Sequence, residues 1–236
     1  MHGRHARMQE AEQTVAMERG SAVHALVLGT RKVCAYPGSQ RRGKEYEAFA
    51  AEHADSEILT MAEYYKARQM ADAVHECKLA EPMLKGILEQ TILFRWMGLE
   101  CRATPDIRGT DYLTELKTAS SSDPERFIWM ALRQHYHAQM RMQGIAVECA
   151  IKELGPLQAP PLDNFIVCVE SAEPFPVTVF RIDEKALEAG EKLLVLWIER
   201  LKNCEKSQIF PPYAQCVMPI DLPEELELDY GKLEEV

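Results

Sequence analysis

The 236-residue sequence contains no long apolar run, although 47% of its residues are hydrophobic. A membrane-spanning helix needs about 20 consecutive apolar residues, and no stretch of this chain approaches that length. The opening segment, residues 1–7, is polar and basic and lacks the apolar core of a signal peptide. We therefore expect a cytoplasmic protein with no membrane partner that buries one sizeable core.

The sequence also lacks cysteine pairs at the spacing of metal or redox motifs. Its seven cysteines are scattered along the chain, and no two of them are separated by only two residues. Scattered thiols are typical of a reducing compartment, whereas small secreted proteins pair their cysteines in a disulfide framework. Disulfides are therefore not expected to stabilise this fold.

Positive charge is scarce, with 27 Lys and Arg against 37 Asp and Glu and a formal net charge of −10. This balance disfavours DNA binding over the whole surface, because phosphate contacts from Lys and Arg dominate the affinity for DNA. The distribution is uneven, however: residues 1–44 hold eight basic and three acidic groups, and residues 221–236 hold one basic and seven acidic groups. A basic entry surface and an acidic tail can coexist, although each charge run also fits an ordinary solvated face.

Two carboxylates and a lysine stand out against this background. Asp106 follows a proline, and after eight intervening residues comes an acid-x-Lys triplet that begins at Glu115 and ends at Lys117. Side chains on a strand alternate between its faces, so Glu115 and Lys117 would project together from a strand at residues 111–118. Hard divalent cations such as Mg²⁺ prefer oxygen ligands of this kind, completed by water and substrate phosphate. The pattern therefore predicts a metal-dependent hydrolytic site.

The acid-x-Lys triplet is weak evidence by itself, because the chain contains it three times. Glu76 and Lys78 match it near the end of a helical run, and Asp183 and Lys185 match it where a helix begins. Only Glu115 lies inside an alternating strand with an aspartate upstream. The alternative for that stretch is a solvated hairpin whose surface ion pair contributes about 0–1 kcal/mol.

The flanking segments are predicted to complete the site. The connection after Asp106 can fold the strands on either side of it into a hairpin, with Asp106 opposite Glu115. A further β-prone run begins at Glu89 and would bring its carboxylate to the edge of the same sheet. Downstream, an Asp-Pro helix start predicts a helix over residues 124–143, whose spacing carries Gln139 toward the sheet.

Several further motifs occur in a fixed order along the chain. They are Gly20 to Gly29, which contains His24; Arg41 to Phe49, which contains Lys44; Glu89; Pro105-Asp106; Glu115 to Ala119; and Tyr136 to Gln139. Together they resemble the PD-(D/E)XK nuclease domain of RecE-type exodeoxyribonucleases, the exodeoxyribonuclease VIII type, and more distantly lambda exonuclease and the RecB nuclease domain. The resemblance covers roughly residues 15–200.

The resemblance assigns roles to particular residues of this chain. It implies that Asp106 and Glu115 are the principal metal ligands and that the backbone carbonyl of Leu116 is a further one. Lys117 would orient or help to deprotonate the attacking water and stabilise charge on the phosphate. Glu89 would complete the metal site or hold a metal-bound water.

Two other family positions match, and two depart from the pattern. His24 corresponds to the histidine that RecB-like and RecE-like nucleases place beside the metal; from periodicity alone, a hydrogen-bonded core histidine is the alternative. Gln139 corresponds to the glutamine of the family's Gln-x-x-x-Tyr helix and is a candidate catalytic residue. Gln143 stands where that motif has its tyrosine, and Thr104 stands at a place that is often basic.

The implied activity is that of a Mg²⁺-dependent exonuclease that degrades linear double-stranded DNA 5′ to 3′. It would expose 3′ single strands for homologous recombination of the phage or prophage type. Mn²⁺ would substitute for Mg²⁺, and Ca²⁺ would bind without turnover. The implied partners are double-stranded DNA ends, a single-strand annealing recombination protein and further copies of the chain in a trimeric or tetrameric ring. The candidate DNA contacts are Arg41, Arg42 and Lys44.

Other readings remain open. Some relatives hold an iron–sulfur cluster through one early and three closely spaced late cysteines; here only Cys204 and Cys216 lie late, so we expect no cluster. The chain could instead be a structure- or sequence-specific endonuclease of the same superfamily, a catalytically lapsed DNA-binding subunit, or an unrelated α/β protein with a coincidental hairpin. Retention of Asp106, Glu115 and Lys117 together argues against a lapsed site.

The predicted fold class is α/β, with a PD-(D/E)XK core in which helices flank a mixed sheet. The nuclease domain would span residues 1–206, with a helical N-terminal part at 1–88 and a catalytic core at 89–206, followed by a Pro-rich acidic tail at 207–236. Helices are expected at 8–28, 44–54, 61–77, 82–88, 124–143 and 184–202, and strands at 89–96, 99–104, 111–118, 164–170 and 177–182.

Overall fold

The computed structural model describes residues 14–153, 162–212 and 216–217, and contacts divide the chain into two units, residues 1–195 and 196–236. Most of the predicted acidic tail, and the first residues of the helix predicted at 8–28, lie outside the described residues. The first unit contains every sheet and the candidate site. Helix α6 (Glu184–Ser207) begins in the first unit and ends in the second.

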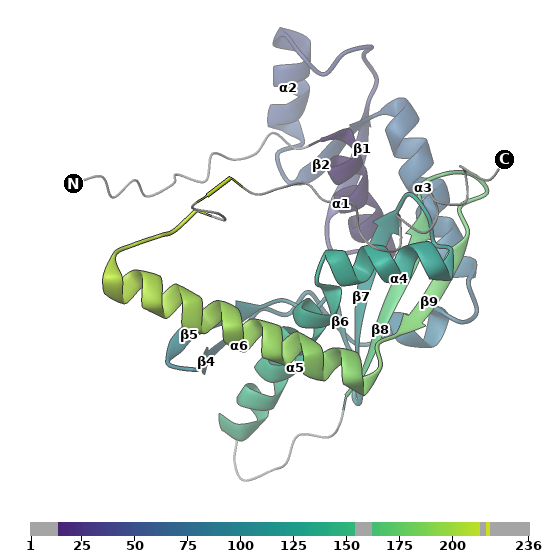
Figure 1. Cartoon of the computed structure of the whole chain (residues 1–236). Helices are drawn as coiled ribbons and strands as arrows, with labels where there is room; N and C mark the ends of the chain where they lie inside the picture. The colour runs from purple at the N-terminus through teal and green to yellow at the C-terminus, as the bar shows by residue number, and fades with distance from the viewer. Residues whose placement is uncertain (1–13, 154–161, 213–215, 218–236) are drawn as a thin grey trace, which may run out of the picture. The chain divides into compact units, whose positions relative to one another are not determined.

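A five-stranded mixed sheet forms the centre of the first unit (Figure 1). Strands β7 and β8 pair in parallel over eight residues each, and the other neighbours in this sheet pair antiparallel. The sheet thereby confirms the expected α/β class with a mixed sheet. In spatial order its strands are β3 (Ile87–Leu88), β6 (Ile107–Arg108), β7 (Tyr112–Ala119), β8 (Asp163–Glu170) and β9 (Val177–Arg181).

The central strand β7 contacts a different hydrophobic cluster on each face, as its alternating side chains require. Leu116 packs with residues of α1 (Val15–Leu28) and α3 (Met61–Glu76). Leu113 packs on the other face with α5 (Tyr136–Glu153) and a separate hairpin. Glu115 and Lys117 therefore share the face of β7 that carries Leu113.

The N-terminal part is not purely helical, which corrects the expectation for residues 1–88. Strands β1 (Lys32–Tyr36) and β2 (Ser56–Thr60) pair in parallel, with α2 (Lys44–Glu52) between them in sequence. Neither strand alternates apolar and polar residues, so the pattern that predicts a half-buried strand is missing. Helix α3 starts where its capping signal predicts, because the Thr60 hydroxyl accepts the Glu63 backbone N–H at 3.3 Å.

The hairpin predicted from strands 99–104 and 111–118 is wrong. Strand β5 (Leu99–Ala103) pairs instead with β4 (Ile92–Trp96) in a sheet of two strands, and the short β6 pairs with β7. Only residues 97–98 connect β4 to β5, which is the short loop of a β-hairpin. The segment predicted as a helix at 82–88 forms a 3₁₀ turn at Glu81–Leu84 followed by β3.

The helix predicted over 124–143 is two helices. Helix α4 (Pro124–Arg133) ends at a turn in which His135 has a φ of 58°, and α5 begins at Tyr136. A left-handed histidine leaves no proline or glycine signal in the sequence. The expected end at residue 143 is also wrong, because α5 continues to Glu153. Among the helices that the structure describes, none combines the length and the apolar content that a membrane span requires.

Candidate active site

Pairing between β6 and β7 brings Asp106 to Glu115. Ile107 is paired with Thr114, so the preceding Asp106 lies beside the next residue of β7, which is Glu115. The Asp106 Oδ2 atom accepts the backbone N–H of Leu116 at 2.8 Å. The two carboxylates are therefore neighbours, as expected, although β6 rather than the strand at 99–104 achieves this.

The Glu115 carboxylate is buried and accepts three side-chain hydrogen bonds. Its side chain is 6% exposed, and Oε1 accepts from Lys117 Nζ at 2.7 Å and from Gln139 Nε2. Oε2 accepts from Gln143 Nε2 at 2.8 Å. A carboxylate offers about four acceptor positions, so these donors leave one position, on Oε2, for another partner. Glu115 is thereby held in a single orientation.

Lys117 is held by three side chains on its side of β7. In addition to Glu115, its Nζ donates to Gln139 Oε1 at 3.2 Å and lies 4.7 Å from the centre of the Tyr136 ring. The lysine side chain is 17% exposed. Contacts with a carboxylate, an amide and an aromatic face hold the ammonium group in position.

His24 approaches the same carboxylates from the α1 layer. Its Nδ1 lies 3.5 Å from Asp106 Oδ2, and its side chain is 22% exposed. Burial lowers the pKa of His24, and Lys117 lowers it further, while Glu115 and a hydrogen bond with the Leu116 backbone raise it. The imidazole is thus favoured in its neutral form, which can act as a metal ligand or as a hydrogen-bond partner.

Burial raises the pKa of the Asp106 carboxyl to about 7, and the charge of Glu115 raises it as well. The Leu116 N–H and Lys117 act in the opposite direction but do not compensate. Two carboxylates forced together in a buried place are destabilised unless a positive charge joins them. This electrostatic strain is typical of a site built to receive a cation.

Glu89 lies at the margin of this group rather than on a strand. It falls between β3 and β4 with a φ of 44°, and its backbone N–H donates to the Asp106 carbonyl at 3.0 Å. Its Oε1 is 3.9 Å from Arg31 Nη2, and its charge contributes to raising the pKa of both Asp106 and His24. The structure therefore brings Glu89 near the carboxylates without a direct side-chain bond to them.

The predicted DNA contacts differ in how they are engaged. Arg41 is partly buried, where it donates to Glu18 at 2.5 Å and to the Ile58 carbonyl at 2.8 Å. Arg42 and Lys44 are exposed at the start of α2. Arg41 is thus already paired within the fold, whereas the other two side chains are accessible.

The donor set fits a hard divalent cation. Asp106, Glu115 and the Leu116 carbonyl would supply oxygen ligands, with His24 and Glu89 beside them. Within the described residues, no three His, Cys, Asp or Glu side chains lie close enough to hold a metal by themselves. Mg²⁺ is commonly held by one or two carboxylates together with water and phosphate oxygens, so two carboxylates and a main-chain oxygen agree with that mode of binding.

Two residues near the carboxylates were not predicted to take part. Gln143 was noted only as a departure from the tyrosine of the family pattern, yet it is 3% exposed and bonds to Glu115. Tyr136 was quoted within a motif without a role, and its ring lies against Lys117. The spacing of Gln139 and Gln143, one helical turn apart, was the signal that could have identified the second glutamine.

Comparison with known proteins agrees with this fold. A family model described as "PDDEXK-like domain of unknown function (DUF3799)" matches residues 1–219. A crystal structure described as a "Putative exonuclease" from Eubacterium rectale has a TM-score of 0.61 to this chain at 13% sequence identity, covering 94% of this chain and 82% of that chain. At this identity the likeness concerns the fold alone. No curated protein matches the sequence.

Proposed function

The chain belongs to the PDDEXK-like family of unknown function, and we propose that it is a divalent-metal-dependent deoxyribonuclease of the exonuclease type. One observation carries the proposal: Asp106, Glu115 and Lys117 converge at the β6–β7 pair, where burial and mutual repulsion raise the pKa of Asp106 to about 7. A phosphodiester is an anion, so its hydrolysis needs positive charge at the phosphate and an activated water. Carboxylates beside a lysine are suited to that task.

In this proposal Asp106, Glu115 and the Leu116 carbonyl hold the cation, with His24 and Glu89 next to them. A bound Mg²⁺ would polarise the phosphate and lower the pKa of a water. The role of the protein is to hold these oxygens in place. Gln139 and Gln143 fulfil part of it by donating to opposite oxygens of Glu115.

Lys117 supplies the fixed positive charge of the proposed site. Its ammonium group lies on the Glu115 side of β7, 17% exposed, so it can contact a phosphate oxygen or a water that approaches the carboxylates. Gln139 and Tyr136 restrict its motion. Preorganised charge of this kind stabilises the transition state without further reorganisation.

We propose that DNA ends are the substrate and that digestion proceeds 5′ to 3′. Support comes from the resemblance to RecE-type exodeoxyribonucleases and, for the fold, from the likeness to the structure described as a putative exonuclease. The same resemblance supports a ring of subunits, a single-strand annealing partner and a role in phage-type recombination. The exposed side chains of Arg42, just before α2, and of Lys44, its first residue, are the proposed DNA contacts.

The test is a time course on linear duplex DNA labelled at the 5′ or the 3′ end, in Mg²⁺ and in EDTA. Wild type should release labelled nucleotide only with metal, and first from the 5′-labelled end. Lys117→Ala should reduce the rate by about 10²–10³-fold, the effect of removing one preorganised charged donor. Lys185→Ala is the matched control, because it alters an exposed acid-x-Lys triplet.

Closed circular plasmid distinguishes an exonuclease from an endonuclease of the same superfamily. An enzyme that needs an end should leave the circle intact while it digests the linearised plasmid. Nicking of the circle would favour the endonuclease. Binding of linear duplex without any release in Mg²⁺ or Mn²⁺ would instead favour a lapsed, DNA-binding subunit.

A further inference from the structure

Helix α4 presents an exposed face that the candidate active site does not use. Trp129 is 70% exposed, and Ile128 and Leu132 are 49% and 42% exposed. The opposite face is fixed to the sheet, because Phe127 is 1% exposed and stacks on Phe180 with ring centroids 4.4 Å apart. The orientation of α4 is therefore set, and its apolar outer residues are displayed to solvent.

Two arginines flank the tryptophan on this outer face. Arg126, Trp129 and Arg133 are spaced by three and four residues, so they lie one above another along a single stripe of the helix. Both arginines are exposed, and within the described part of the chain neither is paired with an acidic side chain. In a protein with a net charge of −10, two arginines on either side of an exposed aromatic ring are a local exception, and Glu125 is the acidic residue of α4 within one turn of that ring.

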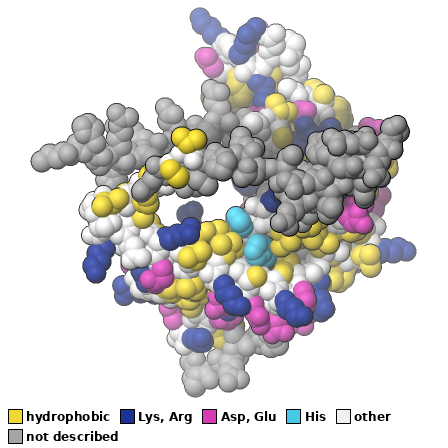
Figure 2. Space-filling model, in the orientation of Figure 1, with side chains coloured by type: hydrophobic (Ala, Val, Ile, Leu, Met, Phe, Trp, Pro, Cys, Tyr) yellow, Lys and Arg dark blue, Asp and Glu magenta, His cyan; other side chains and the backbone are white. Residues whose placement is uncertain are grey.

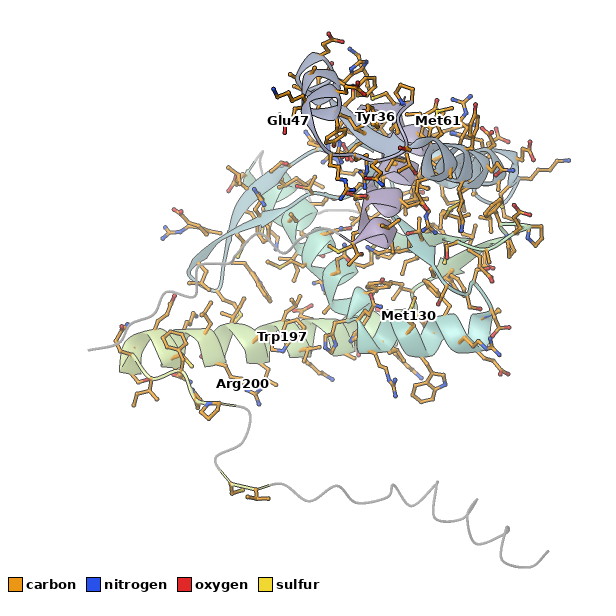
Figure 3. The ribbon with its side chains drawn as sticks, turned by 90° about the horizontal axis from the view of Figure 1, so that it is seen from above. Tyr36, Glu47, Met61, Met130, Trp197 and Arg200 are labelled. Carbon is orange, nitrogen blue, oxygen red and sulfur yellow. The ribbon has the colours of Figure 1, made fainter. Side chains whose placement is uncertain are left out.

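One end of the stripe is close in sequence to a residue of the candidate active site. Helix α4 ends at Arg133, and after a two-residue turn Tyr136 places its ring 4.7 Å from Lys117 Nζ. The Tyr136 hydroxyl also donates to Gln134 in that turn at 2.7 Å. Met130, labelled on α4 in Figure 3, packs inward with Phe127 and so keeps the helix beside the sheet.

We propose that Arg126, Trp129 and Arg133 bind the unpaired nucleotides of a DNA strand next to the hydrolytic site. The indole would stack on a base, and the two guanidinium groups would contact phosphates on either side of it. About 10 Å of helix separates the two arginine positions, so one strand can contact both. This inference rests on the proposed nuclease function and specifies how that site handles single-stranded DNA.

The chemistry of the face favours nucleic acid over a second copy of the chain. Figure 2 shows hydrophobic side chains exposed on the side of the molecule that carries α4. The buried centre of a protein interface is depleted in charge, whereas here a positive charge lies within one turn of Trp129 on each side. A two-fold contact through this face would bring four arginines together. Phosphate groups interleaved with bases match the stripe better.

The test is a fluorescence titration with a single-stranded oligodeoxynucleotide in EDTA, where no hydrolysis occurs. The chain has three tryptophans, and stacking should quench the exposed Trp129. Trp129→Phe should lose that quenching but retain most of the affinity, measured with a labelled oligonucleotide, because a phenyl ring also stacks. Trp129→Ala should weaken binding by about 5- to 150-fold.

The arginines are tested through the salt dependence of binding. Replacing both by glutamine, Arg126→Gln with Arg133→Gln, should reduce the slope of log affinity against log salt by about 1.4, since each single-strand phosphate contact contributes about 0.7. Tyr65→Ala is the matched control for Trp129→Ala, because Tyr65 is a 58% exposed aromatic residue on another helix, α3. It should leave affinity and slope unchanged.

Wild-type affinity in Trp129→Ala would overturn the inference. A change in sedimentation of that variant, with unchanged oligonucleotide affinity, would also overturn it and identify the face as a subunit contact. These outcomes are distinct from failure of the proposed function. If wild type hydrolyses no DNA in Mg²⁺ but Trp129 is still quenched by the oligonucleotide, the nuclease proposal fails and the binding stripe stands.

Discussion

The metal-free protein should lose stability as the pH rises from about 4 to about 7, and Asp106→Asn should remove most of that loss. Burial and then Glu115 raise the pKa of Asp106 from 3.8 to about 7 in the folded state. The folded chain therefore retains a proton in a pH range where the unfolded chain has released it. The free energy of unfolding falls as the pH rises through that range and is lowest above pH 7.

The size of the effect follows from the difference between the two pKa values. A shift of one pKa unit corresponds to 1.36 kcal/mol, so a rise from 3.8 to about 7 costs about 4 kcal/mol when Asp106 is fully ionised. In Asp106→Asn, the asparagine side chain keeps an oxygen that can accept the Leu116 N–H, as Asp106 does at 2.8 Å. This hydrogen bond to a neutral oxygen is weaker by about 1 kcal/mol than the bond to a carboxylate. The variant should therefore be about 2–3 kcal/mol more stable than wild type at pH 8.

Urea denaturation in EDTA at pH 4 and pH 8 measures this difference. At pH 4 the two proteins should differ little, because Asp106 is protonated in the folded wild type. Asp111→Asn is the matched control, since Asp111 is an exposed aspartate just before β7. The reasoning fails if Asp106→Asn stabilises the protein equally at both pH values, or not at all at pH 8.

Two further predictions concern the cation and the second glutamine. Mg²⁺ affinity should rise with pH up to about 7 and then level off, because Asp106 must be ionised to bind the cation and its pKa without metal is about 7. Calorimetric titration with Mg²⁺ between about pH 5.5 and 8 measures this change. A constant affinity over that range would contradict the prediction. Gln143→Leu, which removes the 2.8 Å bond to Glu115 Oε2, should lower hydrolysis or Mg²⁺ affinity by about 10–100-fold. Gln143→Asn, which keeps an amide donor on a shorter side chain, tests whether part of the bond can be restored. Nuclease rates across a Mg²⁺ series measure this effect, and an unchanged metal dependence in the leucine variant would assign Gln143 to packing alone.

Strand β7 was the part of the chain that its sequence defined best. Alternation over eight residues separates Leu113 from Leu116 and places Glu115 with Lys117, and tertiary contacts follow that alternation. The competing triplets were distinguished for the same reason. Lys78 and Lys185 are exposed at helix ends. Neither belongs to a buried strand, whose alternation would place an acid and a lysine on the same face.

The partners of β7 could not be obtained in the same way. Strand β6 has two residues, which is too short for any periodicity, so the pairing of Asp106 with Glu115 was expected from a hairpin that does not form. Strands β1 and β2 were missed because neither alternates apolar and polar residues. Short strands are stabilised by the neighbour that they pair with, and local sequence contains little of that information.

Gln139 was predicted to reach the sheet, but through a helix that the structure breaks. A continuous helix over 124–143 would put Ile128, Leu132 and Gln139 on one inward face, whereas Ile128 and Leu132 are exposed on α4. The turn at His135 lets Phe127 face the β8–β9 side while α5 directs Gln139 at Glu115. The break therefore has two consequences, since the turn that delivers the glutamines to the carboxylate also leaves Trp129 on the outside. A substitution that straightened this turn should disturb both the hydrolytic site and the proposed DNA-binding stripe, whereas Trp129→Ala should affect only the second.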